Sequence, residues 1–287
     1  IDSSSSLLEP FSGPVFAHSI GAVRGHRDYM EDFYDVAAKG RFAAVYDGHG
    51  GDEVSRFLKN YFYRQIINSL KLMADTSQLT SSKHEKQVVG QVGMVAEALK
   101  TALAVVERSV LRTKAWCYQG STLAACVIVN ETNSRDENSG GDMQKNRMFA
   151  VTANIGDSRI VLSRAGQAVE LTEDHKPNLP RELKRIRALG GNVRWFGMVS
   201  PEGRPVEGTG VYRVNGNLAV SRAIGDAAEK PFVSPLADIR ITPLNFTGGD
   251  ENGIGSGCRG DSRDEFIVVA TDGLWDMMTS DEVVQYV

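Results

Sequence analysis

The sequence has little cysteine. Its 287 residues include three, Cys117, Cys126 and Cys258, and no two of them are spaced as C-x-x-C. An odd number of thiols argues against a disulfide scaffold, and the lack of close pairs argues against a structural zinc site. We therefore expect an intracellular protein, cytoplasmic or nuclear. Because the sequence does not begin with Met, removal of an N-terminal targeting segment stays open.

Long hydrophobic runs and an excess of basic residues are also missing. A helix that crosses a bilayer needs about 20 consecutive apolar residues, so no membrane insertion is expected. The 32 basic and 36 acidic residues leave a net charge of −4, which argues against nucleic acid as a partner. With 41% hydrophobic and 24% charged residues, the composition is typical of a globular protein.

Several short apolar runs, each bounded by turn residues, predict buried strands. They cover residues 42–46, 123–129, 148–153 and 266–271, and residues 159–163 are expected to form a hairpin with the strand that starts near Phe149. Helical spacing and end signals predict helices over residues 53–70, 88–113 and 180–189, with another beginning near Ser280. The polar segments 131–145 and 248–263 are expected to be loops.

Strands and long helices do not alternate regularly in this pattern. It favours an α+β fold with antiparallel sheets over a doubly wound parallel sheet. No linker divides the chain, so we expect a single domain over residues 1–287.

Carboxylates follow the predicted strands. Asp47 and Asp272 each begin an Asp-Gly pair directly after an apolar run, and Asp157 follows Gly156 in the same way. Each such turn alone is explained by ordinary turn chemistry. Together with Glu31-Asp32, however, they predict a crowded acidic site. Converging carboxylates repel one another, and a divalent cation with oxygen ligands, Mg²⁺ or Mn²⁺, relieves the repulsion.

These motifs resemble the metal-dependent PPM/PP2C family of protein serine/threonine phosphatases, in the family's order and over almost the whole chain. The matching segments are residues 27–32 (RDYMED), 45–51 (VYDGHGG), 120–124 (GSTLA), 153–159 (ANIGDSR), 174–177 (DHKP), 218–226 (LAVSRAIGD) and 270–276 (ATDGLWD), with Glu182, Arg185-Ile186 and Gly190-Gly191 between them.

The resemblance implies a four-layer α-β-β-α sandwich, in which two antiparallel sheets are flanked by helices. It also implies two catalytic Mg²⁺ or Mn²⁺ ions, with a weaker third, that activate a water for attack on the phosphate. By matching position, the protein ligands of the two ions are Asp47, the Gly48 carbonyl, Glu31 and Asp272. Asp157, Asp276 and Asp272 resemble the third-metal site, and Asp32 is expected to hold a metal-bound water.

The same resemblance gives two residues catalytic roles. Arg27 would bind the substrate phosphate, since a guanidinium can hold two phosphate oxygens at once. His49 would be the general acid that protonates the leaving serine or threonine oxygen. The alternative for His49 is a structural histidine beside a metal ligand.

Other residues near these motifs have more ordinary interpretations. We expect a structural loop role for His175, a strand start near the site for Ser121-Thr122 and core packing for Cys117 and Cys126. Arg222 has two interpretations, a phosphopeptide contact or a structural ion pair. Within the flap at residues 194–210, Trp195 and Phe196 are either exposed recognition residues or anchors on the core.

Members of the family end with a further segment in which an Asp-Asn motif supplies another metal ligand. No matching Asp precedes Val287, so we expect this chain to lack that segment. The resemblance predicts a monomeric phosphatase that hydrolyses phosphoserine and phosphothreonine in phosphoprotein substrates. A non-catalytic pseudophosphatase or phosphoprotein-binding module is the alternative, because of the missing ligand. A two-metal nuclease is a more remote possibility, which the acidic net charge disfavours.

Overall fold

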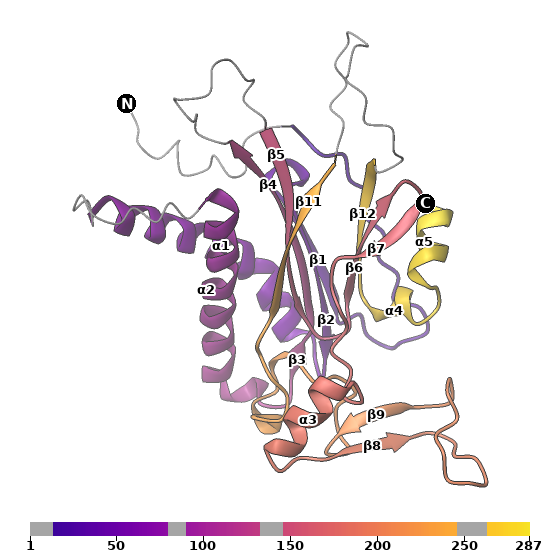
Figure 1. Ribbon diagram of the computed structural model, residues 1–287. Helices are drawn as coiled ribbons and strands as arrows, with labels where there is room; N and C mark the ends of the chain where they lie inside the picture. The colour runs from indigo at the N-terminus through magenta and orange to yellow at the C-terminus, as the bar shows by residue number, and fades with distance from the viewer. Residues whose placement is uncertain (1–13, 80–89, 133–145, 246–262) are drawn as a thin grey trace.

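The computed structural model of the chain describes residues 14–79, 90–132, 146–245 and 263–287 (Figure 1). Within these ranges the strands form a sheet of seven, a sheet of three and a separate pair. The larger sheet has the order β10-β3-β2-β4-β5-β11, and β1 also pairs with β2. Its strands are β1 (Asp32–Ala37), β2 (Phe42–His49), β3 (Gly120–Ser121), β4 (Leu123–Thr132), β5 (Asn146–Ile155), β10 (Ile224–Gly225) and β11 (Asp238–Leu244).

The smaller sheet has the order β12-β6-β7, and both sheets are antiparallel. It consists of β6 (Arg159–Arg164), β7 (Gln167–Glu170) and β12 (Asp264–Ala270), while β8 (Val193–Phe196) and β9 (Val211–Val214) form the separate pair. The α-helices are α1 (Glu53–Leu79), α2 (Gln91–Arg112), α3 (Pro180–Ala188), α4 (Asp272–Trp275) and α5 (Ser280–Tyr286). Short 3₁₀ turns occupy Ala38–Gly40, Lys114–Trp116 and Ala227–Glu229. None of the described helices is both long and apolar enough to span a bilayer.

Strand β4 explains why the elements form layers. Its side chains alternate between two buried faces, because successive residues of a strand point in opposite directions. One set packs against α1 and α2, and the other lies between the two sheets. The first set is Leu123, Ala125, Val127 and Val129, and the second is Ala124, Cys126 and Ile128.

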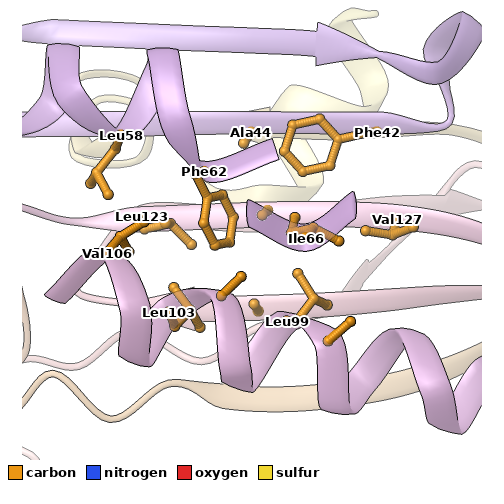
Figure 2. Close-up of a cluster of buried hydrophobic side chains, with 14 of the residues drawn as sticks. Phe42, Ala44, Leu58, Phe62, Ile66, Leu99, Leu103, Val106, Leu123 and Val127 are labelled. Atoms are coloured by element: carbon orange, nitrogen blue, oxygen red, sulfur yellow. The ribbon is translucent and has the colours of Figure 1, made fainter. Parts of the chain in front are cut away.

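The largest core lies between the two long helices and the seven-stranded sheet. Figure 2 shows Phe62 and Ile66 from α1 meeting Leu99 and Leu103 from α2 over the strands. Full burial of such a side chain contributes roughly 1.5–3 kcal/mol. The outer face of the small sheet is covered by Trp275 of α4 and by α5, so the order of layers is α-β-β-α (Figure 1). The predicted fold class is therefore confirmed.

Each predicted helix and strand is present, but α1 is longer than expected and one predicted connection is wrong. The helix expected over residues 53–70 continues to Leu79, and the other helices begin and end within about three residues of the expected positions. The loops expected at 131–145 and 248–263 lie outside the described residues apart from their ends. The strands on either side of the first do form a hairpin, with Leu123 opposite Ile155 and Thr132 opposite Asn146.

The predicted hairpin between residues 149 and 163 is wrong. Both edges of β5 are occupied, by β4 and by β11, so β6 cannot pair with it. At Gly156, whose φ is +105°, the chain instead leaves the large sheet, and β6 pairs with β12 and β7 in the small one. The turn at Asp157 is thus a crossing between the two sheets.

Candidate active site

Carboxylates from four segments gather at one end of the sandwich. β2 ends with Asp47-Gly48-His49, Asp157 follows β5, and β12 leads into α4, which begins at Asp272. Asp32, the first residue of β1, is paired with Asp47 on the neighbouring strand. In Figure 1 this is the end of the sandwich nearer to α3 and the β8–β9 pair.

Thr122 and Ser158 connect the end of β2, at Asp47, with the turn at Asp157. The Thr122 amide donates to the Asp47 carbonyl at 2.9 Å, and the Thr122 hydroxyl lies 2.7 Å from the hydroxyl of Ser158, next to Asp157. Both residues are almost fully buried. The prediction that Ser121-Thr122 starts a strand near the site is confirmed.

Gly48 occupies a position that has no room for a side chain. A Cβ there would contact the Ser55 hydroxyl and the Glu31 carbonyl oxygen. The Gly48 amide donates to that carbonyl at 3.2 Å, and the Ser55 hydroxyl donates to it at 2.6 Å. These bonds fix the segment before β1 against the end of β2.

The clustered carboxylates change one another's protonation. Burial, reinforced by the charges of Asp32, Asp272 and Asp157, raises the pKa of Asp47 to about 9. Burial and the charge of Asp272 raise the pKa of Asp157 to about 7. Burial also raises the pKa of Asp32, although the Thr271 hydroxyl opposes the shift by donating to its carboxylate at 2.9 Å. Unless a cation compensates, the folded site therefore retains protons at neutral pH.

The donor set fits a hard divalent cation, although the side chains do not yet surround one. Among the described residues, no three acidic, histidine or cysteine side chains are arranged so that they could hold a metal ion as they stand. Asp272 lies close enough to Asp47 for its charge to contribute to the raised pKa of Asp47. Because every donor is an oxygen and the carboxylates repel one another, Mg²⁺ or Mn²⁺ is the kind of ion that fits.

Two predicted ligands, Glu31 and Asp276, are engaged with other partners. The Glu31 carboxylate accepts a hydrogen bond from the Gly51 amide at 2.8 Å. The Asp276 side chain is exposed and lies 3.5 Å from the ammonium group of Lys176.

Arg27 lies on the exposed side of the cluster. Its side chain is open to solvent, and its positive charge lowers the pKa of Asp32. A guanidinium in this position can receive an anion from solvent beside the carboxylates, which agrees with the predicted phosphate contact.

His49 has a partner that sequence reasoning missed. Its Nε2 lies 2.9 Å and 2.8 Å from the two carboxylate oxygens of Asp226, which is buried and 177 residues further along the chain. Asp226 ends the motif at residues 218–226 and adopts the left-handed conformation, with φ of 51°. Nothing in the local sequence distinguishes this Gly-Asp pair from an ordinary turn.

His175 has the predicted structural role. Its Nδ1 accepts a hydrogen bond from the Gly156 amide at 3.1 Å, and its Nε2 lies 3.2 Å from a carboxylate oxygen of Asp238. Burial, followed by the charge of Arg222, lowers the pKa of His175. A neutral ring therefore holds the turn that presents Asp157.

For Arg222, the structure selects the ion pair. The side chain is buried and donates to Glu182 at 3.0 Å and to Asp238 at 2.9 Å. It therefore joins α3 to β11 and is not open to a phosphopeptide.

The two aromatic residues of the flap differ in exposure. Trp195 packs against Tyr212, with 5.0 Å between ring centroids, and its Nε1 donates to the Met198 carbonyl at 2.9 Å. It is anchored within the β8–β9 pair, whereas Phe196 is 47% exposed.

Of the cysteines, Cys126 packs between the sheets as predicted, and burial raises the pKa of its thiol to about 12. Cys117 is a partly exposed free thiol, and Cys258 lies outside the described residues.

Solved structures share this architecture. The chain superimposes on the "serine-threonine phosphatase 2C from Toxoplasma gondii" with a TM-score of 0.59 at 22% identity, covering 91% of this chain and 79% of that one. It also superimposes on a "C.elegans sex determining protein" with a TM-score of 0.57 at 21% identity, covering 90% and 52%. At these identities the likeness concerns the fold alone.

The sequence comparisons identify the family. The family model described as "Protein phosphatase 2C" matches residues 22–287, and the chain belongs to that family. It is 30% identical to "Probable protein phosphatase 2C 59" of Arabidopsis thaliana, covering 98% of this chain and 76% of the relative. It is 32% identical to "Probable protein phosphatase 2C member 13, mitochondrial" of Oryza sativa subsp. japonica, covering 91% and 56%. The chain spans about half of several relatives, 49% of "Probable protein phosphatase 2C 76" of Arabidopsis thaliana among them.

Proposed function

We propose that this protein is a metal-dependent protein serine/threonine phosphatase that hydrolyses phosphoserine and phosphothreonine. The observation that carries the proposal is the convergence of Asp32, Asp47, Asp157 and Asp272, with the pKa of Asp47 raised to about 9. A bound divalent cation would relieve the repulsion between these carboxylates. Membership of the protein phosphatase 2C family supports the reaction class.

The proposed ligands of two Mg²⁺ or Mn²⁺ ions are Asp47, the Gly48 carbonyl, Glu31 and Asp272. Asp157 and Asp276 are proposed for a weaker third ion and Asp32 for a bound water. When bound, such ions polarise the phosphate and activate water as the nucleophile. The donor atoms come from the segments at β1, β2, α4 and the turn after β5.

Arg27 and His49 are proposed to act on the substrate directly. Arg27 is exposed beside the cluster and can bind two phosphate oxygens bidentately. His49 is partly exposed at the end of β2 and is proposed to give a proton to the leaving serine or threonine oxygen. Its bond to Asp226 holds the ring in one orientation.

The substrates are proposed to be phosphoproteins. Residues 1–287 are proposed to form one domain, and the protein is proposed to be a monomer. An intracellular location, cytoplasmic or nuclear, is supported by the free thiols of Cys117 and Cys126. One relative carries the word mitochondrial in its name, so a mitochondrial location is the alternative to test.

The test combines turnover with metal binding. Phosphate release from a phosphothreonine peptide is measured as Mn²⁺ is added to EDTA-treated protein, and Mn²⁺ binding is followed by electron paramagnetic resonance. We expect turnover to rise with bound Mn²⁺ and both to fall in Asp272→Asn. Full activity in EDTA would contradict the metal dependence. Tight Mn²⁺ and phosphopeptide binding without turnover would favour the non-catalytic alternative.

A further inference from the structure

We propose that Asp226 is a positioning residue for His49, held in place from α2 by Glu107. The proposal rests on the proposed function, in which His49 protonates the leaving oxygen. Its first support is the contact itself. Both oxygens of the Asp226 carboxylate lie within hydrogen-bond distance of a single ring nitrogen, at 2.8 Å and 2.9 Å. This geometry places a proton on Nε2 and fixes the plane of the ring.

Burial makes this carboxylate costly without its partner. Asp226 is 2% exposed, whereas the His49 side chain is 24% exposed. A buried carboxylate is strongly unfavourable unless it is paired and hydrogen-bonded. Asp226 is therefore the buried partner of the pair, and the solvent-accessible part of the pair belongs to the His49 ring.

The backbone at Asp226 adopts a strained conformation. Its φ of 51° and ψ of 49° belong to the left-handed region, which is unfavourable for residues other than glycine. The conformation is held by the Asp226 amide, which donates to the Gln119 carbonyl at 2.8 Å. Such strain persists only where the surrounding structure imposes it.

Helix α2 supplies a further constraint. The Glu107 side chain is buried and accepts a hydrogen bond from the Gly225 amide at 2.8 Å, one residue before Asp226. Lys230 lies 3.1 Å from the same carboxylate and donates to the Ala223 carbonyl at 2.9 Å. The loop that carries Asp226 is therefore fastened on both sides by one charged pair.

Gly120 shows how closely the pair is enclosed. A Cβ at this position would collide with the Asp226 carboxylate and with Nε2 of His49. Gly120 also pairs with Gly225 across β3 and β10. The backbone of β3 therefore packs directly against both side chains.

The experiment compares Asp226→Ala and Asp226→Asn with His49→Gln on two substrates at saturating Mn²⁺. A phosphothreonine peptide has a basic leaving group that needs a proton, whereas p-nitrophenyl phosphate has one that hardly does. We expect Asp226→Ala to lower kcat on the peptide about 10–100-fold, no more than His49→Gln, which removes the acid itself. The kcat of Asp226→Ala on p-nitrophenyl phosphate should change less than about threefold. Asp226→Asn keeps one hydrogen-bond acceptor, so its kcat on the peptide should fall less than that of Asp226→Ala.

Two further measurements separate positioning from a merely structural role. In a His49→Gln background, Asp226→Ala should cause no further loss on the peptide, because residues that act through one another are not additive. Asp264→Asn is the matched control. Asp264 is a buried carboxylate paired with Arg164 at the start of β12, the end of that strand away from Asp272, and its loss should lower stability without changing the ratio between the substrates.

A spectroscopic measurement tests the contact without activity. In protein labelled with ¹⁵N in its histidine rings, the Nε2 proton of His49 is assigned by its disappearance in His49→Gln. We expect this proton to be protected from exchange in the metal-free wild type and unprotected in Asp226→Ala. Equal losses on both substrates, additive losses in the double variant or an unchanged Nε2 proton would overturn the proposal. If the wild type releases no phosphate at all, the proposed function fails, while the Nε2 proton still decides whether Asp226 positions His49.

Discussion

The guanidinium of Arg159 lies over the indole ring of Trp275, 5.3 Å from its centroid. The same guanidinium donates to both carboxylate oxygens of Asp174, at 3.0 Å and 2.9 Å. Trp275 is the last residue of α4, which begins at Asp272, and it is followed by Asp276. The Arg159 side chain on β6 thus contacts the short helix α4, which lies beside the two proposed metal ligands Asp272 and Asp276.

We therefore expect Arg159→Lys to weaken Mn²⁺ binding about 10–100-fold, the usual effect of losing a residue that orients metal ligands. Lysine keeps the charge but cannot donate bidentately or stack its flat face on the ring. Binding is measured by titration calorimetry. Arg56→Lys, at an exposed ion pair with Asp52, is the control and should leave the affinity unchanged. An affinity in Arg159→Lys equal to that of the wild type would show that Trp275 alone keeps α4 in place.

Replacing Asp47 should make the metal-free protein more stable. Its folded pKa of about 9 lies above the unfolded value of 3.8, so this group favours folding below pH 3.8 and progressively less as the pH rises toward 9. Asn has no carboxylate to ionise, so Asp47→Asn removes this decrease in the free energy of unfolding with rising pH. In urea unfolding with EDTA, the variant should exceed the wild type at pH 7 and by more at pH 9, and it should bind Mn²⁺ more than about 100-fold more weakly.

The exposed Asp276, changed to Asn, is the matched control for that experiment and should leave the pH dependence of the metal-free protein as it is. A less stable Asp47→Asn protein with the same pH dependence as the wild type would mean that the carboxylates do not repel one another.

His175 should contribute a pH dependence of opposite sign. Because its pKa is lowered in the folded state, the neutral ring favours folding above the unfolded value of 6.5, and this contribution is lost as the pH falls below it. His175→Gln should flatten the fall in unfolding free energy between pH 6.5 and 5. It should also cost about 1–3 kcal/mol at pH 7.5, from the bond with the Gly156 amide.

Urea unfolding of both proteins across this range gives the difference directly, so the titrating aspartates cancel. His26→Gln, which replaces an exposed histidine, serves as the reference and should change neither quantity. If His175→Gln keeps the full wild-type pH dependence, the ring is not held neutral.

The buried ion pairs of Arg222 should matter for stability and not for substrate binding. Burial alone would raise the pKa of Glu182, but the bonds from Arg222 and Arg185 outweigh it and hold the value at about 2. This stabilisation is complete above pH 4.5 and is lost as the pH falls toward 2. Arg222→Met should cost about 3–5 kcal/mol, since it leaves Glu182 buried without one partner.

At a temperature where the Arg222→Met protein stays folded, its KM for a phosphothreonine peptide should stay within about threefold of the wild type. The check is a urea titration at pH 7 followed by steady-state kinetics. A large rise in KM with little loss of stability would restore the phosphopeptide interpretation of Arg222.

The sequence by itself determined what depends on neighbours along the chain. Apolar runs bounded by turn residues located β2, β4, β5 and β12, because strands that pack in the layers of a core are rich in apolar residues. The Asp-Gly pairs that follow two of these apolar runs located Asp47, within the end of β2, and Asp272, at the start of α4. Helical spacing located α2 but placed the end of α1 at Leu70, nine residues before its end at Leu79.

Only the tertiary structure decided which segments meet. The chain crosses between sheets at Gly156 because both edges of β5 are already occupied, and the local pattern of β6 contains no trace of that competition. Asp226 contacts His49, which lies 177 residues earlier in the chain. The proposed role of Asp226 depends on its burial and its left-handed backbone, and the Gly-Asp sequence alone predicts neither. Contacts between distant segments are set by which pairings bury the most apolar surface and satisfy the most polar groups together. The buried surface and the satisfied polar groups depend on the whole fold, whereas the sequence pattern shows only the structural preference of each segment.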